Sequence, residues 1–272
     1  MIRQTKGVSI RILRCDSGSA FQPQSFGRKD VSVFLTTIWN EEERKCINFI
    51  MKSPPRRKDR SEAGELYNRK DEKMEYFFYC SDKPGSGALR KQMNETHWAF
   101  MDAYASAFIA RGPTLAEDGL TPTGSMHIVD LPDAEAVRVF AYEEPNFKAG
   151  VYSDVFISRW RNELGRTMWE FKGDPDHHQR FLIIGYGRPG LDEEYRRLRQ
   201  DRQSYLAGQG HQERLIAGGS LLSDNGQWAG SAMMVELPDR AAAEAMLAAD
   251  PVVKAGLYDR IQTHRWRFGG RR

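Results

Sequence analysis

The chain has 272 residues, which is enough for two domains of about 100 residues each with a segment left over. Hydrophobic residues make up 40% of it, and no run of about 18 apolar residues predicts a membrane span. Three widely spaced cysteines without a C-x-x-C pattern imply neither a disulfide framework nor a zinc site, and a reducing cytoplasm fits best. The net charge is only +3, and it arises in the N-terminal segment.

Residues 1–73 are expected to form a basic, poorly ordered extension. They carry 16 Lys and Arg against 10 Asp and Glu, and the sequence SPPRRKDR at 53–60 is typical of a solvated linker. The first 29 residues faintly resemble an organellar presequence, although an extension with an uncertain start is the simpler interpretation. A charge excess confined to this segment gives little support for nucleic-acid binding, which we do not expect.

From residue 74 onward the sequence contains one module twice. Short motifs recur with a spacing of 106 residues and without gaps, which predicts a first domain at 74–172 and a second at 178–272. The matching segments are 111–115 with 217–221, 124–125 with 230–231, 131–133 with 237–239, 144–145 with 250–251, 148–150 with 254–256, and 159–161 with 265–267.

Each module is predicted to begin with a strand and a helix. Apolar runs closed by Pro-Gly predict strands at 76–79 and 181–184. Apolar residues at helical spacing among charged ones then predict helices at 89–108 and 193–209, each with one buried face.

Two strands, a second helix and a closing strand follow in each module. The strands end near Leu115 or Leu221 and continue at 125–131 or 231–237 after a turn. Pro-Asp at 132–133 and at 238–239 starts the second helix, and the last strands are expected at about 155–161 and 260–268.

The element order βαββαβ predicts an α+β fold of tandem ferredoxin-like modules, with two helices on one face of an antiparallel sheet. The other face is too apolar to meet water, as Met126, Ile128, Met233 and Val235 indicate. We therefore predict that the two sheets cover each other as an intramolecular pseudo-dimer of the dimeric α+β barrel type.

Two further motifs admit a functional and a structural interpretation. GYGRPG at 185–190 matches a dinucleotide fingerprint, but that site requires a parallel βαβ unit, so no nucleotide cofactor is expected. RWR at 159–161 and 265–267 is explained by strand alternation: the Trp packs inward, and Arg159 and Arg265 face outward or toward an anionic ligand. RNA-binding modules with the same βαββαβ order stack bases on a pair of aromatic residues in the third strand, and the third strands of this chain lack that pair.

Both modules resemble the YciI-like family of the YCII-related domain. The sequence ADPVVKAGLY at 249–258 matches the family's D-P-x-x-x-A-G-x-Y signature, Ala217-Gly218-Gly219 matches its A-G-P, and His97 matches its helix-borne histidine. The resemblance implies a small ferredoxin-like protein, usually dimeric, with a His/Asp site in a pocket. It also implies proton transfer on a small organic molecule, of lyase or isomerase type, without metal or nucleotide cofactor, and leaves a homo-oligomer open.

Neither module keeps the whole His/Asp pair. The first has His97 with Glu144, and the second has Asp250 with Gln203 at the histidine position. We hypothesise that His97 is a general acid/base with Glu144 or Asp250 as its carboxylate. Ligand contacts are predicted for the following residues: Gly112, Gly218, Gln203, Arg159 and Arg265.

Each of these residues also has a purely structural interpretation. His97 can be a half-buried polar residue, a carboxylate before proline often only organises a turn, and the glycines can serve the backbone alone. The alternative function is then a non-catalytic small-molecule-binding or regulatory module with a degenerate site.

Overall fold

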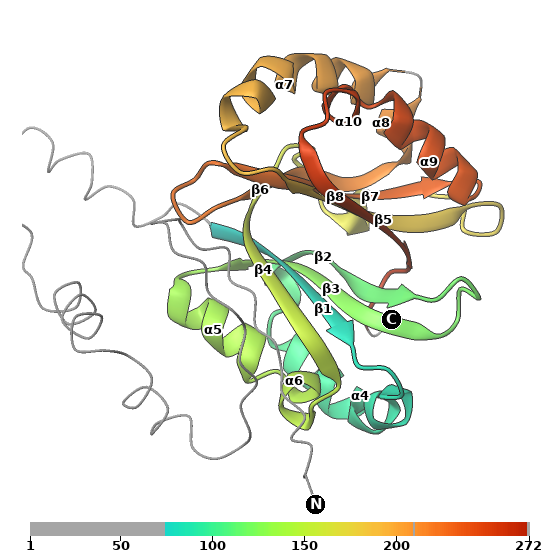
Figure 1. The fold of residues 1–272 in the computed structure, drawn as a ribbon. Coiled ribbons are helices and arrows are strands. Elements are labelled where there is room, and N and C mark those ends of the chain that lie inside the picture. The colour runs from blue at the N-terminus through green and yellow to red at the C-terminus, as the bar shows by residue number, and fades with distance from the viewer. Residues whose placement is uncertain (1–73, 209, 271–272) are drawn as a thin grey trace, which may run out of the picture. The chain divides into compact units, whose positions relative to one another are not determined.

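The computed structural model describes residues 74–208 and 210–270, so the predicted extension at 1–73 lies outside the described part (Figure 1). No helix of the described part is long and apolar enough to cross a membrane. The first copy consists of β1 (Met74–Asp82), α4 (Gly87–Asp102), β2 (Phe108–Leu115), β3 (Pro122–Leu131), α5 (Ala134–Tyr142), α6 (Pro145–Ala149) and β4 (Tyr152–Asn162). The second consists of β5 (Gln179–Gly187), α7 (Asp192–Ala207), α8 (His211–Arg214), β6 (Leu215–Leu222), β7 (Trp228–Leu237), α9 (Arg240–Ala249), α10 (Pro251–Lys254) and β8 (Tyr258–Trp266).

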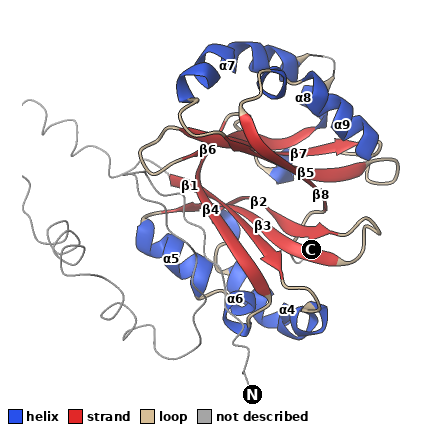
Figure 2. Cartoon of the chain, viewed as in Figure 1, coloured by secondary structure: helices blue, strands red, loops and turns tan. Residues whose placement is uncertain are grey.

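The eight strands form one closed antiparallel barrel in the order β1-β3-β2-β8-β5-β7-β6-β4. Each copy contributes four neighbouring strands, and the copies join where β2 pairs with β8 and β4 pairs with β6. The helices lie outside, those of the two copies on opposite sides (Figure 2). The predicted pseudo-dimer is confirmed, and closure gives every edge strand a partner.

The barrel interior is one hydrophobic core shared by both copies. Trp160 and Trp266 are 4% and 2% exposed, which confirms that the Trp of each RWR motif points inward. Burying so much apolar surface is the main favourable term for bringing the two sheets together. The large side chains of this cluster include Phe77, Tyr79, Phe156, Trp160, Leu182, Ile184, Met234 and Trp266.

Glycine is required where the two copies meet. A Cβ on Gly112 of β2 would lie 1.9 Å from the carbonyl oxygen of Arg267, and one on Gly219 of β6 would lie 2.0 Å from that of Arg161. Both distances are far below any normal contact, so a side chain at either position would push the joined strands apart.

These two glycines are structural equivalents, which corrects the uniform spacing of 106. Gly112 pairs with Met126 and Gly219 with Ala232 at the same step of the β2–β3 and β6–β7 ladders. Gly218, which the sequence aligned with Gly112, instead occupies the place of Arg111. The connection from the first helix to the second strand is longer in the second copy, 208–214 against 103–107, and this shifts β6.

The helix predicted at 89–108 extends six residues past the C-terminal end of the helix in the structure. α4 ends at Asp102, a short 3₁₀ helix follows at Ala105–Ala107, and Phe108 already belongs to β2. The apolar periodicity continues past the helix because Tyr104 and Phe108 pack into the same cluster as Met101. Helical spacing of buried residues therefore did not mark the helix end.

One histidine lies near the join of the copies and predicts a pH dependence. The ring of His264 in β8 lies tilted by 40° with its centroid 4.9 Å from that of Tyr79, and its Nδ1 is 3.5 Å from the Tyr79 hydroxyl. Burial, aided by the charge of Arg240, lowers the pKa of His264 to about 4. An unfolded histidine titrates near 6.5, so between pH 6.5 and 4 the unfolded chain takes up a proton that the folded chain does not.

Stability that depends on the neutral His264 ring is therefore complete above pH 6.5 and is lost as the pH falls toward 4. Replacing it by phenylalanine, His264→Phe, is expected to reduce this loss by up to about 1.4 kcal/mol per pH unit. Urea unfolding at pH 7 and pH 5 measures the difference, with the exposed His177→Phe as control. Equal pH dependence of wild type and His264→Phe would contradict the assignment.

Candidate functional site

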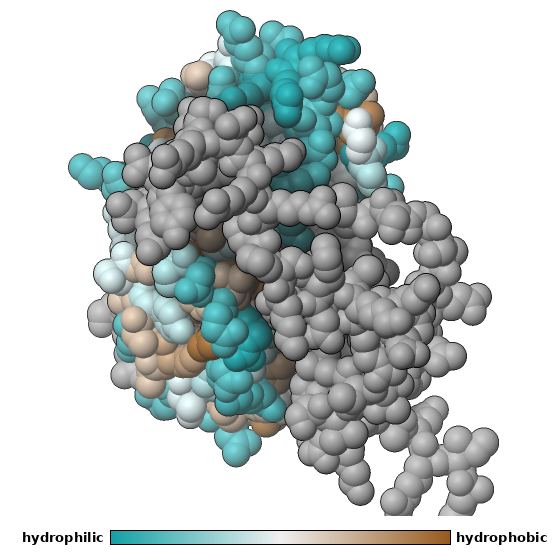
Figure 3. Space-filling view, turned by 90° about the vertical axis from the view of Figure 1, so that its left-hand side faces the viewer, coloured by the Kyte–Doolittle hydropathy of each residue, from teal (hydrophilic) through white to brown (hydrophobic). Residues whose placement is uncertain are grey.

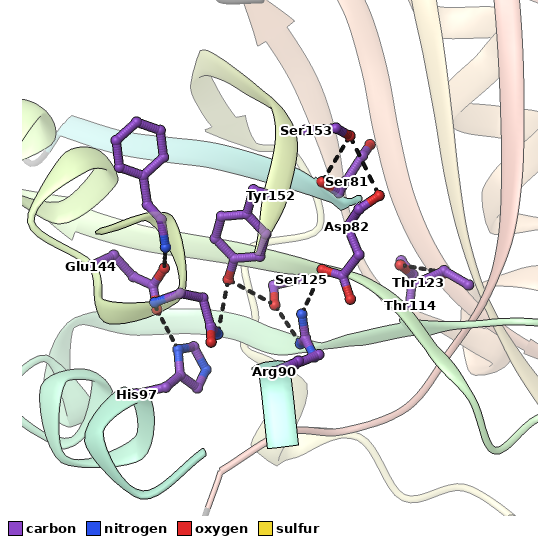
Figure 4. A network of polar contacts seen from close by, with 12 residues as sticks. Ser81, Asp82, Arg90, His97, Thr114, Thr123, Ser125, Glu144, Tyr152 and Ser153 are labelled. Carbon is purple, nitrogen blue, oxygen red and sulfur yellow. Dashed lines mark hydrogen bonds and ion pairs between the residues drawn. The ribbon is translucent and has the colours of Figure 1, made fainter. Parts of the chain in front are cut away.

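The first copy places a histidine against a carboxylate. His97, the eleventh residue of α4, lies with its Nδ1 2.6 Å from Oε1 of Glu144, which precedes α6 (Figure 4). The residues are 9% and 3% exposed, so the contact is shielded from water. The structure thus brings together two of the three predicted catalytic residues.

Backbone N–H groups hold the Glu144 side chain in place. Oε1 accepts a hydrogen bond from the amide of Asn146 at 3.0 Å, and Oε2 accepts one from the amide of Phe147 at 2.8 Å. Glu144 is therefore the N-cap of α6, with Pro145 at the first helical position. The turn-organising interpretation and the site interpretation both hold, because the cap fixes the oxygen that faces His97.

A buried polar network continues from this pair across the copy. The side-chain Nδ2 of Asn146 donates to the hydroxyl of Tyr152 at 3.2 Å, and this hydroxyl donates to Oγ of Ser125 at 3.2 Å. Arg90 donates to the same Oγ at 2.7 Å and to Asp82 at 2.7 Å. Burial raises the pKa of Asp82, which the charge of Arg90 opposes.

Sequence reasoning missed this network. One visible signal was the recurrence of a small polar residue, Ser125 and its counterpart Ser231, in the third strand of each copy, and both accept from a buried arginine. The arginines that donate to these serines, Arg90 and Arg202, could not be assigned without knowing which face of each helix lies over the strand.

A second imidazole lies beside the first. His127 of β3 has its ring centroid 6.1 Å from that of His97 and packs against Phe108 and Phe140. Burial, with smaller contributions from His97, Arg90 and Arg111, lowers the pKa of His127 well below its usual range.

The second copy replaces the histidine by arginine. α4 and α7 both have 16 residues, and the eleventh residue of α7 is Arg202, not Gln203 as the sequence alignment had it. Arg202 Nε donates to Asp250 Oδ2 at 3.0 Å, and its Nη1 donates to Ser231 at 2.6 Å. Asp250 is thus the structural counterpart of Glu144 and, like it, caps a short helix, accepting from Val252.

The Arg202 guanidinium is a permanent cation in this setting. Burial alone would favour its neutral form, but Tyr258 and the Asp250 carboxylate raise its pKa above the usual range. A guanidinium offers donors and no acceptor, so it cannot remove a proton. The His/Asp site is therefore converted in the second copy to a buried ion pair.

The predicted ligand-binding residues lie at three separate places, because Arg265 and Gly112 are both at the β2–β8 join. Gly218 and Gln203 line a cavity of about 200 Å³ in the second copy. Arg159 borders a different cavity of about 410 Å³ beside Tyr76 on the first copy. Arg265 lies in β8, and Gly112 lies at the β2–β8 join.

The Arg159 cavity belongs to a mixed surface. In a side view, the half of the molecule formed by the first copy shows hydrophobic patches, and the half formed by the second is mostly hydrophilic (Figure 3). Apolar residues that line the cavity include Met74, Tyr76, Val137, Tyr142, Val155 and Ile157.

The family model of the YCII-related domain matches the chain twice, at residues 74–161 and 179–267. None of the curated proteins matches it. Among solved structures, the 5-chloro-2-hydroxyhydroquinone dehydrochlorinase of Burkholderia phenoliruptrix AC1100, in complex with 2,5-dihydroxybenzoquinone, is 28% identical; the match covers 33% of this chain and 95% of that chain, with a TM-score of 0.31.

Two further structures are similar over a larger share of the chain. Chlorite dismutase from Candidatus Nitrospira defluvii in complex with imidazole is 8% identical, with 76% of this chain and 95% of that chain covered and a TM-score of 0.46. An anthrone oxidase-like protein is 11% identical, with 74% and 93% covered and a TM-score of 0.46. At these identities the likeness concerns the fold alone.

Proposed function

We propose that this chain, which belongs to the family of the YCII-related domain, performs acid–base chemistry on a small organic molecule at the His97–Glu144 pair of its first copy. The observation that carries the proposal is the 2.6 Å contact between His97 Nδ1 and a carboxylate oxygen that the α6 cap holds fixed. The reaction class is proton transfer of the lyase or isomerase type.

The contact defines the roles of the two ring nitrogens. A carboxylate partner favours the tautomer in which Nδ1 carries the proton, so Nε2 keeps its lone pair and can take a proton from a substrate carbon or hydroxyl. Glu144 then stabilises the imidazolium until the proton returns. Return to another substrate atom completes an isomerisation. In an elimination the leaving group departs with its bonding electrons, and the imidazolium gives its proton to that group or to water, which regenerates the base.

Glu144 is the carboxylate in this proposal, and Asp250 is not. Asp250 is bonded to Arg202 and lies in the other copy's equivalent position. The proposal therefore places chemistry in one copy only.

Replacing His97 by glutamine is expected to lower kcat/KM by at least ~100-fold, because general acid–base groups typically contribute 10² to 10⁴ in rate. A thermal-shift screen of a metabolite library on the full chain supplies the ligands to assay for turnover. His177→Gln, an exposed histidine, is the matched control and should retain full activity. Unchanged turnover in His97→Gln would show that the proton is moved elsewhere.

A second readout needs no substrate. In the chain labelled with ¹⁵N-histidine at pH 8, the His97 ring should show a proton on Nδ1 and none on Nε2, and Glu144→Leu, which removes the acceptor, should abolish this preference. A wild-type ring protonated on Nε2 instead would leave no lone pair for the proposed base.

One observation favours the non-catalytic alternative for part of the molecule. The second copy has arginine in place of the histidine, and a cavity lined by Arg202 and Gln203 lies beside it. Binding without turnover is therefore the function to consider for that copy.

A further inference from the structure

The second copy contains an open cavity next to its Arg202–Asp250 pair. Its volume is about 200 Å³, and it lies between α7, α8 and the strands β6 and β7. Apolar side chains form most of its wall, namely Leu164, Leu206, Leu215 and Met233. Glu163 and Leu164 follow β4, so the first copy completes a cavity of the second.

The first copy fills the corresponding space. At the position of Gly218 it has Arg111, and opposite, at the position of Met233, it has His127. Arg111 is only 9% exposed and lies with its guanidinium 4.9 Å from the ring of Phe108. The cavity is therefore a feature of the second copy's residues and not of the fold.

The polar side chains at the cavity are Glu163, Arg202 and the exposed Gln203 and Gln212, and Glu163 is the carboxylate among them. Glu163 Oε1 accepts from Ser220 at 2.7 Å and from Tyr195 at 3.3 Å, which holds the carboxylate in position with acceptor capacity left over. Arg202 also borders the cavity, but Asp250 and Ser231 engage its guanidinium. A carboxylate at the wall disfavours an anionic ligand and favours one that donates a hydrogen bond.

We propose that this cavity is a second small-molecule site, which binds a neutral, ring-sized molecule carrying a hydroxyl or other hydrogen-bond donor and does not transform it. An apolar cavity of roughly 150 Å³ holds benzene, so about 200 Å³ suits a ring with one substituent. The ring contacts the leucines and Met233, and the donor faces Glu163. Arg202 stands where the first copy has His97, so the site lacks the imidazole on which the chemistry proposed for the first copy depends.

Three probes that differ only in the substituent test this assignment by titration calorimetry on the full chain: benzyl alcohol, toluene and benzoate. Benzyl alcohol is expected to bind, toluene at least tenfold more weakly for want of a donor, and benzoate not detectably. Gly218→Leu should weaken benzyl alcohol at least tenfold by filling the cavity. A Cβ at Gly218 meets only the Cβ of Met233, at 3.7 Å, so this variant has room to fold.

A second filling variant, Ala207→Phe at the exposed mouth of the cavity, should weaken binding to the same extent. It provides an independent test if Gly218→Leu does not fold. Binding of benzyl alcohol should persist in His97→Gln, because the site does not depend on the chemistry proposed for the first copy. The inference is overturned if benzyl alcohol does not bind, if both filling variants bind it as wild type does, or if His97→Gln alone abolishes binding.

Discussion

Replacing Gly219 by alanine is expected to lower the thermal unfolding midpoint by roughly 6–12 °C. The new methyl carbon would lie 2.0 Å from the carbonyl oxygen of Arg161 on the neighbouring strand, so β4 and β6 must separate where the two copies join. Overpacking of this kind costs about 3 kcal/mol, and each kcal/mol shifts the midpoint by about 2–4 °C for a domain of this size. Scanning calorimetry of the purified variant measures the shift.

The adjacent residue supplies the control. Gly218 lies on the same strand, and a Cβ there would be in ordinary contact with Met233 at 3.7 Å. Gly218→Ala should therefore change stability by less than about 1 kcal/mol. Equal melting points for the two variants would mean that the strands do not approach as closely at Gly219 as the structure has them.

Replacing Arg202 by methionine is expected to destabilise the protein by about 3–5 kcal/mol, because it leaves a buried carboxylate without its counter-charge. Asp250 is 1% exposed, and Arg202 is the cation that its side chain contacts. Methionine keeps much of the side-chain length, so the loss reports mainly the unpaired charge. Urea unfolding at pH 7 gives the difference in free energy.

An exposed arginine of the same helix is the matched control. Arg196 pairs with Asp192 and Glu193, but its side chain is 63% exposed, so Arg196→Met should cost no more than about 1 kcal/mol. If Arg202→Met is as stable as Arg196→Met, the buried pair does not exist in solution as described.

Much of the fold could be predicted from the repeat. Two copies of one βαββαβ pattern, each with an apolar sheet face, leave few arrangements other than a barrel in which the sheets cover each other. The pairing of β2 with β8 and β4 with β6 was not visible, because it depends on two glycines whose role is a close approach between backbones. A sequence shows that a residue is glycine, but it does not show which neighbouring strand approaches that glycine closely.

The pair in the first copy was predicted from the sequence, but its counterpart in the second copy was not. His97 and Glu144 were paired through a family resemblance, and the structure places them in contact. Arg202 was missed because the two copies differ by small length changes that nearly cancel. The connection before the second strand is longer in the second copy, and the following hairpin, 223–227 against 116–121, is shorter. A fixed spacing of 106 therefore matched β3 with β7 and β4 with β8, but it placed the first helix, and β2 against β6, one residue out of register.

The two copies interlock within one chain to close a barrel, and nuclear Overhauser spectroscopy can detect this arrangement through two pairs of residues. The indole nitrogen of Trp266 lies against Gly112, and the ring of Trp160 lies against Gly219, so each copy inserts a Trp beside a glycine of the other. The account predicts cross-peaks between both rings and the respective glycine α-protons, unchanged on dilution. Absence of both, or their appearance only between differently labelled chains, would contradict it.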